Sequence, residues 1–406
     1  MELLKQKKLD PERGDVILFN NTSAEHPATY EFTRKMKTLA EGEYNIPFFW
    51  IEYQTYEEAG KNGWLRKGSY KIVNDHPYSA DNTRGYRSAG EVFEEMISLS
   101  GFLPNMQNRI CTQTLKIFIT NSFLTDWFAQ KPGIERQGHY GDAAKMTDDY
   151  VIGMHERSNG STPKRVLLEK RAFVRAAAFV RKEAAWNDFT DCDLCFDNEE
   201  VKRSVIGDKG QLFGDNAISY ISCLGIRKDE EIRAEKIQAR IDAAKKSANG
   251  RSLFGQPPGE EILTPLVENN VSQQGVIDFW NEQDFNLELS DNGNFSNCVY
   301  CPLKGKAKLT QIAATELAAE ERNEDVTPAS IDWWIEMEDK YGRDLRKEKR
   351  KVTSDKKVKF IGFFGATEAL VYRQIKEQAA AGPGPRKNIN GEYVEDESYV
   401  PCNCTD

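Results

Sequence analysis

Three apolar runs along the chain have the pattern of strands. They are residues 15–21 (DVILFNN), residues 46–56 (IPFFWIEYQTY) and residues 217–226 (AISYISCLGI). The first lies between turn residues, and the second is rich in aromatic and β-branched residues, as strands usually are. We therefore predict a strand in each of these places.

Stretches with apolar residues every three or four positions predict helices. The first stretch is residues 27–42 (PATYEFTRKMKTLAEG). Pro27 stands at its start and Gly42 at its end, as helices prefer. Further helices are expected at residues 89–101, 111–129, 227–246, 307–321 and 328–341. In residues 89–101, one face carries Val92, Phe93, Met96 and Ile97. In residues 111–129, one face carries Leu115, Phe118, Ile119, Phe123 and Trp127.

Strands that alternate with helices predict an α/β fold with a mostly parallel sheet covered by helices on both faces. Residues 1–129 and 216–249 would form this nucleotide-type domain, with residues 130–215 as a helical insertion. Residues 250–345 would form a mainly helical C-terminal region, in which residues 264–283 form a short strand, a turn and a helix. Residues 346–406 would be a basic loop and a flexible tail.

Charge and hydropathy narrow the class of protein. The chain has 406 residues, with 55 Lys and Arg against 64 Asp and Glu, a net charge of −9. This surface argues against non-specific nucleic-acid binding, although a local basic patch would be compatible with it. No apolar run approaches the ~20 residues of a membrane span, and the start (MELLKQKKLDPERGD) lacks the apolar core of a signal peptide. We therefore expect a cytoplasmic protein with reduced thiols.

The eight cysteines are then ligands, redox thiols or core residues. Cys298 and Cys301 form a C-x2-C knuckle, a spacing that lets two thiolates bind one metal centre from a single turn. Cys192 and Cys195 form a second pair, and two such pairs would suit a four-cysteine zinc site. The alternative is that either pair is accidental. We expect Cys223, in the middle of a strand, to be a core residue.

Several motifs in order resemble the phosphoadenosine phosphosulfate (PAPS) reductase family, within the adenine nucleotide alpha-hydrolase-like superfamily. The resemblance covers most of the chain outside residues 130–215 and the region after residue 342, where only the closing five residues resemble the family. The motifs are LFNNTSAEHPATYEF (18–32), RKGSYKIVN (66–74), RICTQTLKI (109–117), LGIRKDEEIRA (224–234), SNCVYCPLK (296–304), DWWIEME (332–338) and the closing CNCTD (402–406).

The resemblance implies an adenylyl nucleotide site at the carboxyl ends of parallel strands. The residues that it implies for this site are Asn21, Thr22, Ser23, Lys116, Arg227 and Arg233. The first three would border the adenine or ribose, and the three cations would face anionic groups. Without the resemblance, the two arginines could simply pair with Asp229 and Glu230, and His26 could be a plain helix N-terminal residue.

The resemblance also implies a 4Fe–4S iron–sulfur cluster, held by Cys111, Cys298 and Cys301 with Cys404 or Cys402 as fourth ligand. The two tail cysteines could instead be catalytic nucleophiles, because PAPS reductases carry a C-terminal catalytic cysteine. The implied activity is sulfur or phosphoryl/adenylyl transfer, with a redox donor such as thioredoxin. Zinc is the alternative metal.

The sequence departs from the family at the phosphate loop. No Ser-Gly-Gly loop occurs in the chain, Asn21 stands where the family has Asp, and Ser23 stands where it has Gly. We expect either that the loop is encoded upstream or that the chain is a non-catalytic, cluster- or zinc-stapled binding module of a larger complex. The missing first strand would expose a sheet edge to a protein partner.

Overall fold

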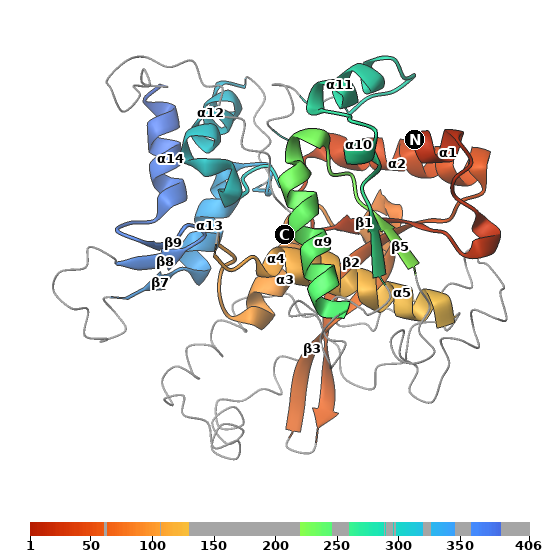
Figure 1. Ribbon diagram of the computed structural model, residues 1–406. Coiled ribbons are helices and arrows are strands. Elements are labelled where there is room, and N and C mark those ends of the chain that lie inside the picture. Colours follow the sequence, from red (N-terminus) through yellow and green to blue (C-terminus); the bar gives the residue numbers. More distant parts are fainter. Residues whose placement is uncertain are drawn as a thin grey trace.

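We describe the protein from a computed structural model (Figure 1). The residues described are 1–60, 63–105, 107–129, 220–245, 260–287, 289, 295, 298–319, 326–345 and 359–382. The insertion predicted at 130–215 and the four cysteines at positions 192, 195, 402 and 404 lie outside them.

The central sheet has four strands in the order β1 (Ile17–Asn21), β2 (Phe48–Gly60), β3 (Gly63–Pro77) and β4 (Gly85–Tyr86). The β1–β2 and β3–β4 pairs are parallel, and the β2–β3 pair is antiparallel. The prediction of an α/β fold with a mostly parallel sheet is therefore confirmed, as are the strands at 15–21 and 46–56.

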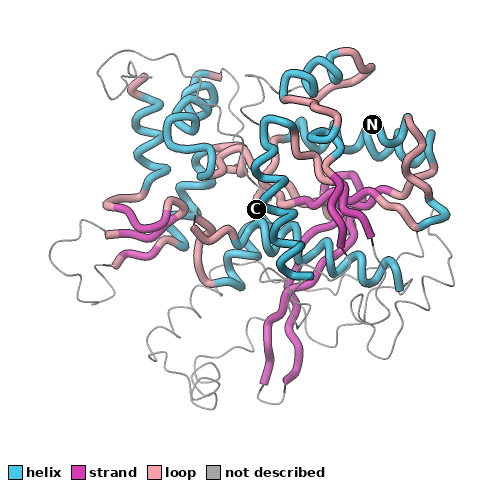
Figure 2. The backbone as a smooth tube through the Cα atoms, in the orientation of Figure 1, coloured by secondary structure: helices cyan, strands magenta, loops and turns pink. Residues whose placement is uncertain are grey.

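Strand β3 was not predicted, and its direction follows from the length of its connection. Two residues join Gly60 to Gly63, which pair with each other at the end of the β2–β3 ladder. So short a connection can join only antiparallel strands, because a parallel crossover needs about a dozen residues or more. The resulting ribbon extends beyond the helices (Figure 2).

Helices cover both faces of the sheet. Successive residues of β2 point to opposite sides, so this strand contributes to a core on each face. Phe48 and Trp50 pack in one core with residues of α2 (Pro27–Tyr44). Phe49, Ile51 and Tyr53 pack on the other side with residues of α3, α5 and the C-terminal region. The remaining helical elements of this domain are α1 (Glu2–Lys5), a 3-10 helix (Pro11–Arg13), α3 (Glu91–Ser100), α4 (Ile110–Thr112), a π-helix (Gln113–Phe118) and α5 (Ile119–Ala129).

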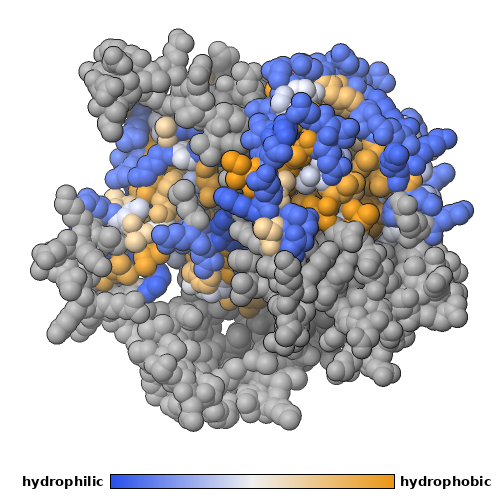
Figure 3. Space-filling model, viewed as in Figure 1, coloured by the Kyte–Doolittle hydropathy of each residue, from blue (hydrophilic) through white to orange (hydrophobic). Residues whose placement is uncertain are grey.

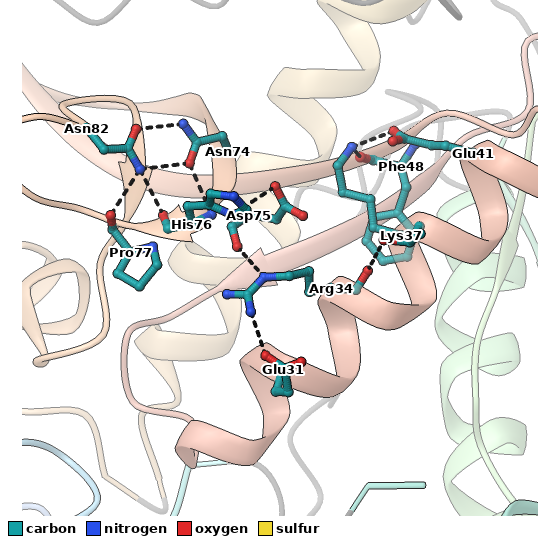
Figure 4. A network of polar contacts seen from close by, with 11 residues as sticks. Glu31, Arg34, Lys37, Glu41, Phe48, Asn74, Asp75, His76, Pro77 and Asn82 are labelled. Atoms are coloured by element: carbon teal, nitrogen blue, oxygen red, sulfur yellow. Dashed lines mark hydrogen bonds and ion pairs between the residues drawn. The ribbon is translucent and has the colours of Figure 1, made fainter. Parts of the chain in front are cut away.

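Polar contacts hold α2 against the strands (Figure 4). Arg34 Nε donates to the Asp75 carbonyl at 2.9 Å. Lys37 Nζ donates to the Phe48 carbonyl at 2.9 Å and pairs with Glu41. These bonds join the helix to β2 and β3, and they fix the helix that follows the turn after β1.

The predicted helix faces can be compared with the buried side chains. Val92, Phe93, Met96 and Ile97 are all buried, so the predicted face of α3 is confirmed. In the next helix, Leu115, Ile119, Phe123 and Trp127 are buried as predicted, but Phe118 is 41% exposed.

The exposure of Phe118 has a local cause. The chain forms a π-helix over Gln113–Phe118, with i→i+5 hydrogen bonds instead of the i→i+4 bonds of an α-helix. The wider turn breaks the 3.6-residue period on which the prediction rested, and Phe118 leaves the buried face.

A second, two-stranded parallel sheet pairs β5 (Tyr220–Cys223) with β6 (Glu260–Leu263). A 3-10 helix (Lys228–Glu230) and α9 (Glu231–Lys245) follow β5, and α10 (Pro265–Glu268) and α11 (Gln273–Asn281) follow β6. The predicted strand at 217–226 and helix at 227–246 are confirmed. The short strand predicted at the start of 264–283 is wrong, because this segment is the short helix α10.

The prediction that Cys223 is a core residue is also wrong. Cys223 is an exposed residue, and Ile221, two residues earlier on the same strand face, is 60% exposed. Figure 3 shows hydrophobic residues at the surface in this region, beside α9. Among the described strands, β5 pairs only with β6, so its other edge and outer face carry no strand.

The C-terminal region packs its helices beside the main domain (Figure 1). The helices predicted at 307–321 and 328–341 are confirmed as α12 and α13, but strands β8 and β9 and helix α14 were not predicted. The elements are a 3-10 helix (Pro302–Lys304), α12 (Gly305–Ala318), α13 (Ile331–Tyr341), β7 (Arg343–Asp344), β8 (Phe360–Gly362), β9 (Gly365–Thr367) and α14 (Val371–Ala380). None of the helices described is long and apolar enough to cross a membrane.

Candidate functional site

One pocket lies where the turn after β1, the start of the α4 helix and the cysteine knuckle meet. Cys111, Cys298 and Cys301 all line it, together with Thr22 and Lys116. It has about 510 Å³ of empty space, including its open mouth. The structure therefore brings together three of the predicted ligand cysteines, although they are far apart in the sequence.

The rest of the pocket wall is largely apolar, with a second cation. Phe93, Leu303 and Trp334 contribute apolar surface, and Arg109 adds a guanidinium beside the ammonium of Lys116. An apolar wall around a few polar groups is typical of ligand sites. Low polarity also strengthens the attraction between the two cations and any negative group in the pocket.

The knuckle is held by its own backbone and by a buried lysine. Cys301 N–H donates to the Cys298 carbonyl at 3.1 Å, and Lys304 N–H donates to the Cys301 carbonyl at 3.0 Å. Lys304 Nζ donates to the Val299 carbonyl at 2.9 Å, with the side chain almost fully buried. A positive charge thus lies directly beneath the turn that carries both thiols.

Other elements hold the knuckle from outside. Val299 N–H donates to the Ala24 carbonyl at 3.4 Å, which connects the knuckle to the turn after β1. The Tyr300 hydroxyl donates to Glu316, and the Tyr372 hydroxyl donates to the Tyr300 carbonyl. Burial raises the pKa of both hydroxyls, so each keeps its proton and acts as a donor. The knuckle is therefore fixed between the sheet domain and the C-terminal helices.

The turn after β1 reaches the knuckle directly. Glu25 and Cys298 form an isolated antiparallel bridge, and Thr22 Oγ1 lies 3.8 Å from Cys298 Sγ. Thr22 also donates to Glu25 Oε1 at 2.7 Å. Burial raises the pKa of Glu25, while the Thr22 hydrogen bond and the nearby charge of Lys116 oppose that shift.

Two of the residues predicted to border a nucleotide make hydrogen bonds to other parts of the protein. Asn21 Nδ2 donates to Glu52 at 2.9 Å and to the Arg87 carbonyl at 2.6 Å. Ser23 Oγ accepts the Val92 N–H at 2.9 Å, so it caps the first turn of α3 in place of a local capping residue. Both side chains are fully buried. Of the three residues predicted here, Thr22 is the one that lines the pocket.

The departure from glycine at position 23 also has a structural meaning. Ser23 has φ of 58°, in the left-handed region that glycine adopts most easily. Its amide donates to Asn21 Oδ1 at 2.8 Å, and this local bond supports the turn. The conformation typical of glycine is therefore kept, and the serine side chain adds a cap.

The predicted anion-facing arginines pair with acidic neighbours. Arg227 lies 3.3 Å from Asp229 and 3.4 Å from Glu230, and Arg233 lies 2.9 Å from Glu230. Neither arginine is among the residues that line the cysteine pocket. The simpler interpretation, ion pairs at a helix start, describes this arrangement, and an anion-binding role stays a prediction.

His26 is the N-cap of α2, as the simpler interpretation predicted. Its Nδ1 accepts the Ala28 N–H at 3.2 Å, and its ring packs against Phe295. Burial, together with the charge of Lys304, lowers the pKa of the imidazole. His26 is therefore a neutral helix cap beside the knuckle.

Three residues at the site were not predicted from the sequence. Arg109 lies within the RICTQTLKI motif, two positions before Cys111, and this proximity to a predicted ligand could have identified it. Glu316 and Tyr372 lie outside every motif, and only the fold brings them to the knuckle.

No family model, curated protein or solved structure matches this chain. The resemblance to the PAPS reductase family therefore rests on the motifs alone, and the function that follows from it is a proposal.

Proposed function

We propose that this protein is a PAPS reductase-like enzyme that holds an iron–sulfur cluster and binds an adenylyl nucleotide, for sulfur or phosphoryl/adenylyl transfer. One observation carries the proposal: Cys111, Cys298 and Cys301 line the same pocket, beside Thr22 and Lys116. Thiolates are the preferred ligands of iron–sulfur clusters. The fourth ligand would be Cys404 or Cys402, and whichever does not bind the cluster could act as a nucleophile.

Zinc is the alternative metal, and it would be held by Cys192, Cys195, Cys298 and Cys301 at about 2.3 Å from each sulfur. A cluster instead binds each thiolate at a different iron. The metal content of the purified protein therefore distinguishes the two.

The charges around the pocket also suit a cluster. Four thiolates give a cluster site a net negative charge, and the cations of Arg109 and Lys116 line the pocket while that of Lys304 lies beneath the knuckle. An opposite charge within a few ångströms stabilises an ionised thiolate.

Anaerobic purification tests the cluster. We expect brown protein that contains iron and acid-labile sulfide, and we expect Cys111→Ser and Cys298→Ser each to reduce the iron content strongly. Cys223→Ser is the matched control, because this exposed thiol does not line the pocket, and its iron content should equal that of the wild type. Colourless protein that contains only zinc would exclude the cluster.

A second candidate function is a non-catalytic binding module whose fold is stabilised by a bound cluster or zinc ion. The full burial of Asn21 and Ser23 favours it, because their side chains serve the fold and are not offered to a nucleotide. Its partner would pair with the free edge of β1, which among the described strands pairs only with β2.

Calorimetry separates the two candidates. Micromolar binding of ATP or PAPS by metal-loaded protein would support the enzyme. No binding at millimolar nucleotide would leave the binding module.

A further inference from the structure

We propose that Tyr372 is a positioning residue for the thiols of Cys298 and Cys301, an inference that rests on the proposed cluster site. Tyr372 lies on α14, more than 70 residues beyond the knuckle along the chain, and its hydroxyl donates to the Tyr300 carbonyl. That carbonyl belongs to the peptide bond that leads directly into Cys301.

The peptide between Tyr300 and Cys301 is held at both of its polar groups. Its carbonyl accepts from Tyr372, and its N–H donates to the Cys298 carbonyl at 3.1 Å. Rotation of this peptide would move Cys301 relative to Cys298, because the peptide unit is planar and turns as one body. The Tyr372 hydroxyl therefore sets the distance and direction between the two thiols.

Tyr372 is itself firmly held, so its hydroxyl cannot turn away from the knuckle. Its N–H donates to the buried carboxylate of Glu338 at 3.1 Å. Its ring lies 5.5 Å, centroid to centroid, from the rings of Trp334 and Phe363. The side chain is fully buried. Outer residues of this kind, which orient metal ligands without touching the metal, typically change metal affinity by about 10–100-fold when they are replaced.

The test compares Tyr372→Phe with a matched control, Tyr341→Phe. Tyr341 is also a buried tyrosine of the C-terminal region, and its hydroxyl donates to Glu94, away from the knuckle. Both variants lose one buried hydroxyl and keep the ring. They should be destabilised to a similar degree, which thermal unfolding measures.

The first readout uses the reduced, metal-free chain. Alkylation by iodoacetamide is followed at each cysteine by mass spectrometry, with Cys111 as internal reference. We expect Tyr372→Phe to raise the rates at Cys298 and Cys301 by about tenfold relative to Cys111, and Tyr341→Phe to change none of these ratios. Global opening would raise all three rates together, so the ratio isolates the knuckle.

The second readout is cobalt(II) binding, followed by the thiolate-to-cobalt absorption. We expect Tyr372→Phe to weaken the affinity by about tenfold and to shift the band, with Tyr341→Phe matching the wild type. Equal alkylation ratios in the two variants would overturn the positioning role. A wild-type chain that contains no iron would overturn the proposed cluster, and the alkylation ratios would still decide the role of Tyr372.

Discussion

The carboxylate of Glu338 gives a stability prediction that depends on pH. It lies on α13, is almost fully buried and accepts the Tyr372 N–H at the start of α14. Burial raises its pKa to about 7, while hydrogen bonds from the backbone of Tyr372, Phe363 and Val371 act in the opposite direction. Burial is the largest of these effects, so the neutral form is favoured at mildly acidic pH.

The size of the effect follows from the difference between the folded and ordinary pKa values. The ordinary value is 4.5 and the folded value is about 7, a difference of about 2.5 pH units, which corresponds to about 3 kcal/mol. Because the folded pKa of Glu338 is raised, its contribution to the free energy of unfolding is fully present below pH 4.5. The contribution is lost as the pH rises through 7, with a slope of at most about 1.4 kcal/mol per pH unit.

Urea unfolding at several pH values between 4.5 and 8 measures this contribution in the wild type and in Glu338→Gln. The variant cannot titrate at this position. The free energy of unfolding of the wild type minus that of the variant should therefore fall by about 3 kcal/mol across the range. The variant will also lose stability at every pH, because an amide NH2 replaces an acceptor of a backbone N–H. The slope of the difference is therefore the diagnostic quantity.

Asp339→Asn is the matched control, because Asp339 is the next residue and its side chain is 45% exposed, paired with Arg373. Its profile should still fall across this range, by slightly less than that of the wild type, because the charge of Asp339 contributes a small part of the raised pKa of Glu338. A difference between wild type and Glu338→Gln that stays constant, or that rises with pH, would show that the backbone hydrogen bonds outweigh burial, and the reasoning would fail.

Three further changes test the packing around the site, each through the free energy of unfolding measured by chemical denaturation. Ser23→Ala should lower this free energy by about 1 kcal/mol through loss of the α3 cap, and an unchanged stability would contradict the capping role. Gly90→Ala should cost more than about 2 kcal/mol, because φ is 90° and a Cβ would lie 2.4 Å from the Trp333 ring; a neutral result would refute this close approach. Lys71→Met should cost about 3–5 kcal/mol, since it leaves the buried carboxylate of Glu52 without its ammonium partner at 3.3 Å; Lys71→Arg should recover part of the loss.

The parts of the fold that could be predicted from sequence depend on local periodicity. The face of α3 and the strands β1 and β2 follow from apolar residues repeated at the helical or strand period. The grouping of Cys111 with the knuckle was expected only from the resemblance of the motifs to the PAPS reductase family, and the shared pocket agrees with it.

The parts that could not be predicted depend on single local irregularities or on distant contacts. The π-helix moves Phe118 out of the core. The periodicity of apolar residues does not predict where a helical turn contains an extra residue. Cys223 sits in an apolar run but on a strand face that remains exposed. Tyr372 reaches the knuckle only because α14 packs beside α12 and α13.

The π-helix also lets one continuous helix serve two directions. Its first part presents Cys111 and Lys116 to the pocket, and its second part presents Ile119 and Trp127 to the core. A π-helical turn takes up one residue more than an α-helical turn, so deletion of a single residue within Gln113–Phe118 would restore ordinary winding and leave the two ends of the helix aligned. Cys111 would stay beside the knuckle and Trp127 would stay in the core, while the side chains within the turn, Lys116 among them, would shift. A one-residue change in chain length would thus alter the charged wall of the pocket and keep its first cysteine.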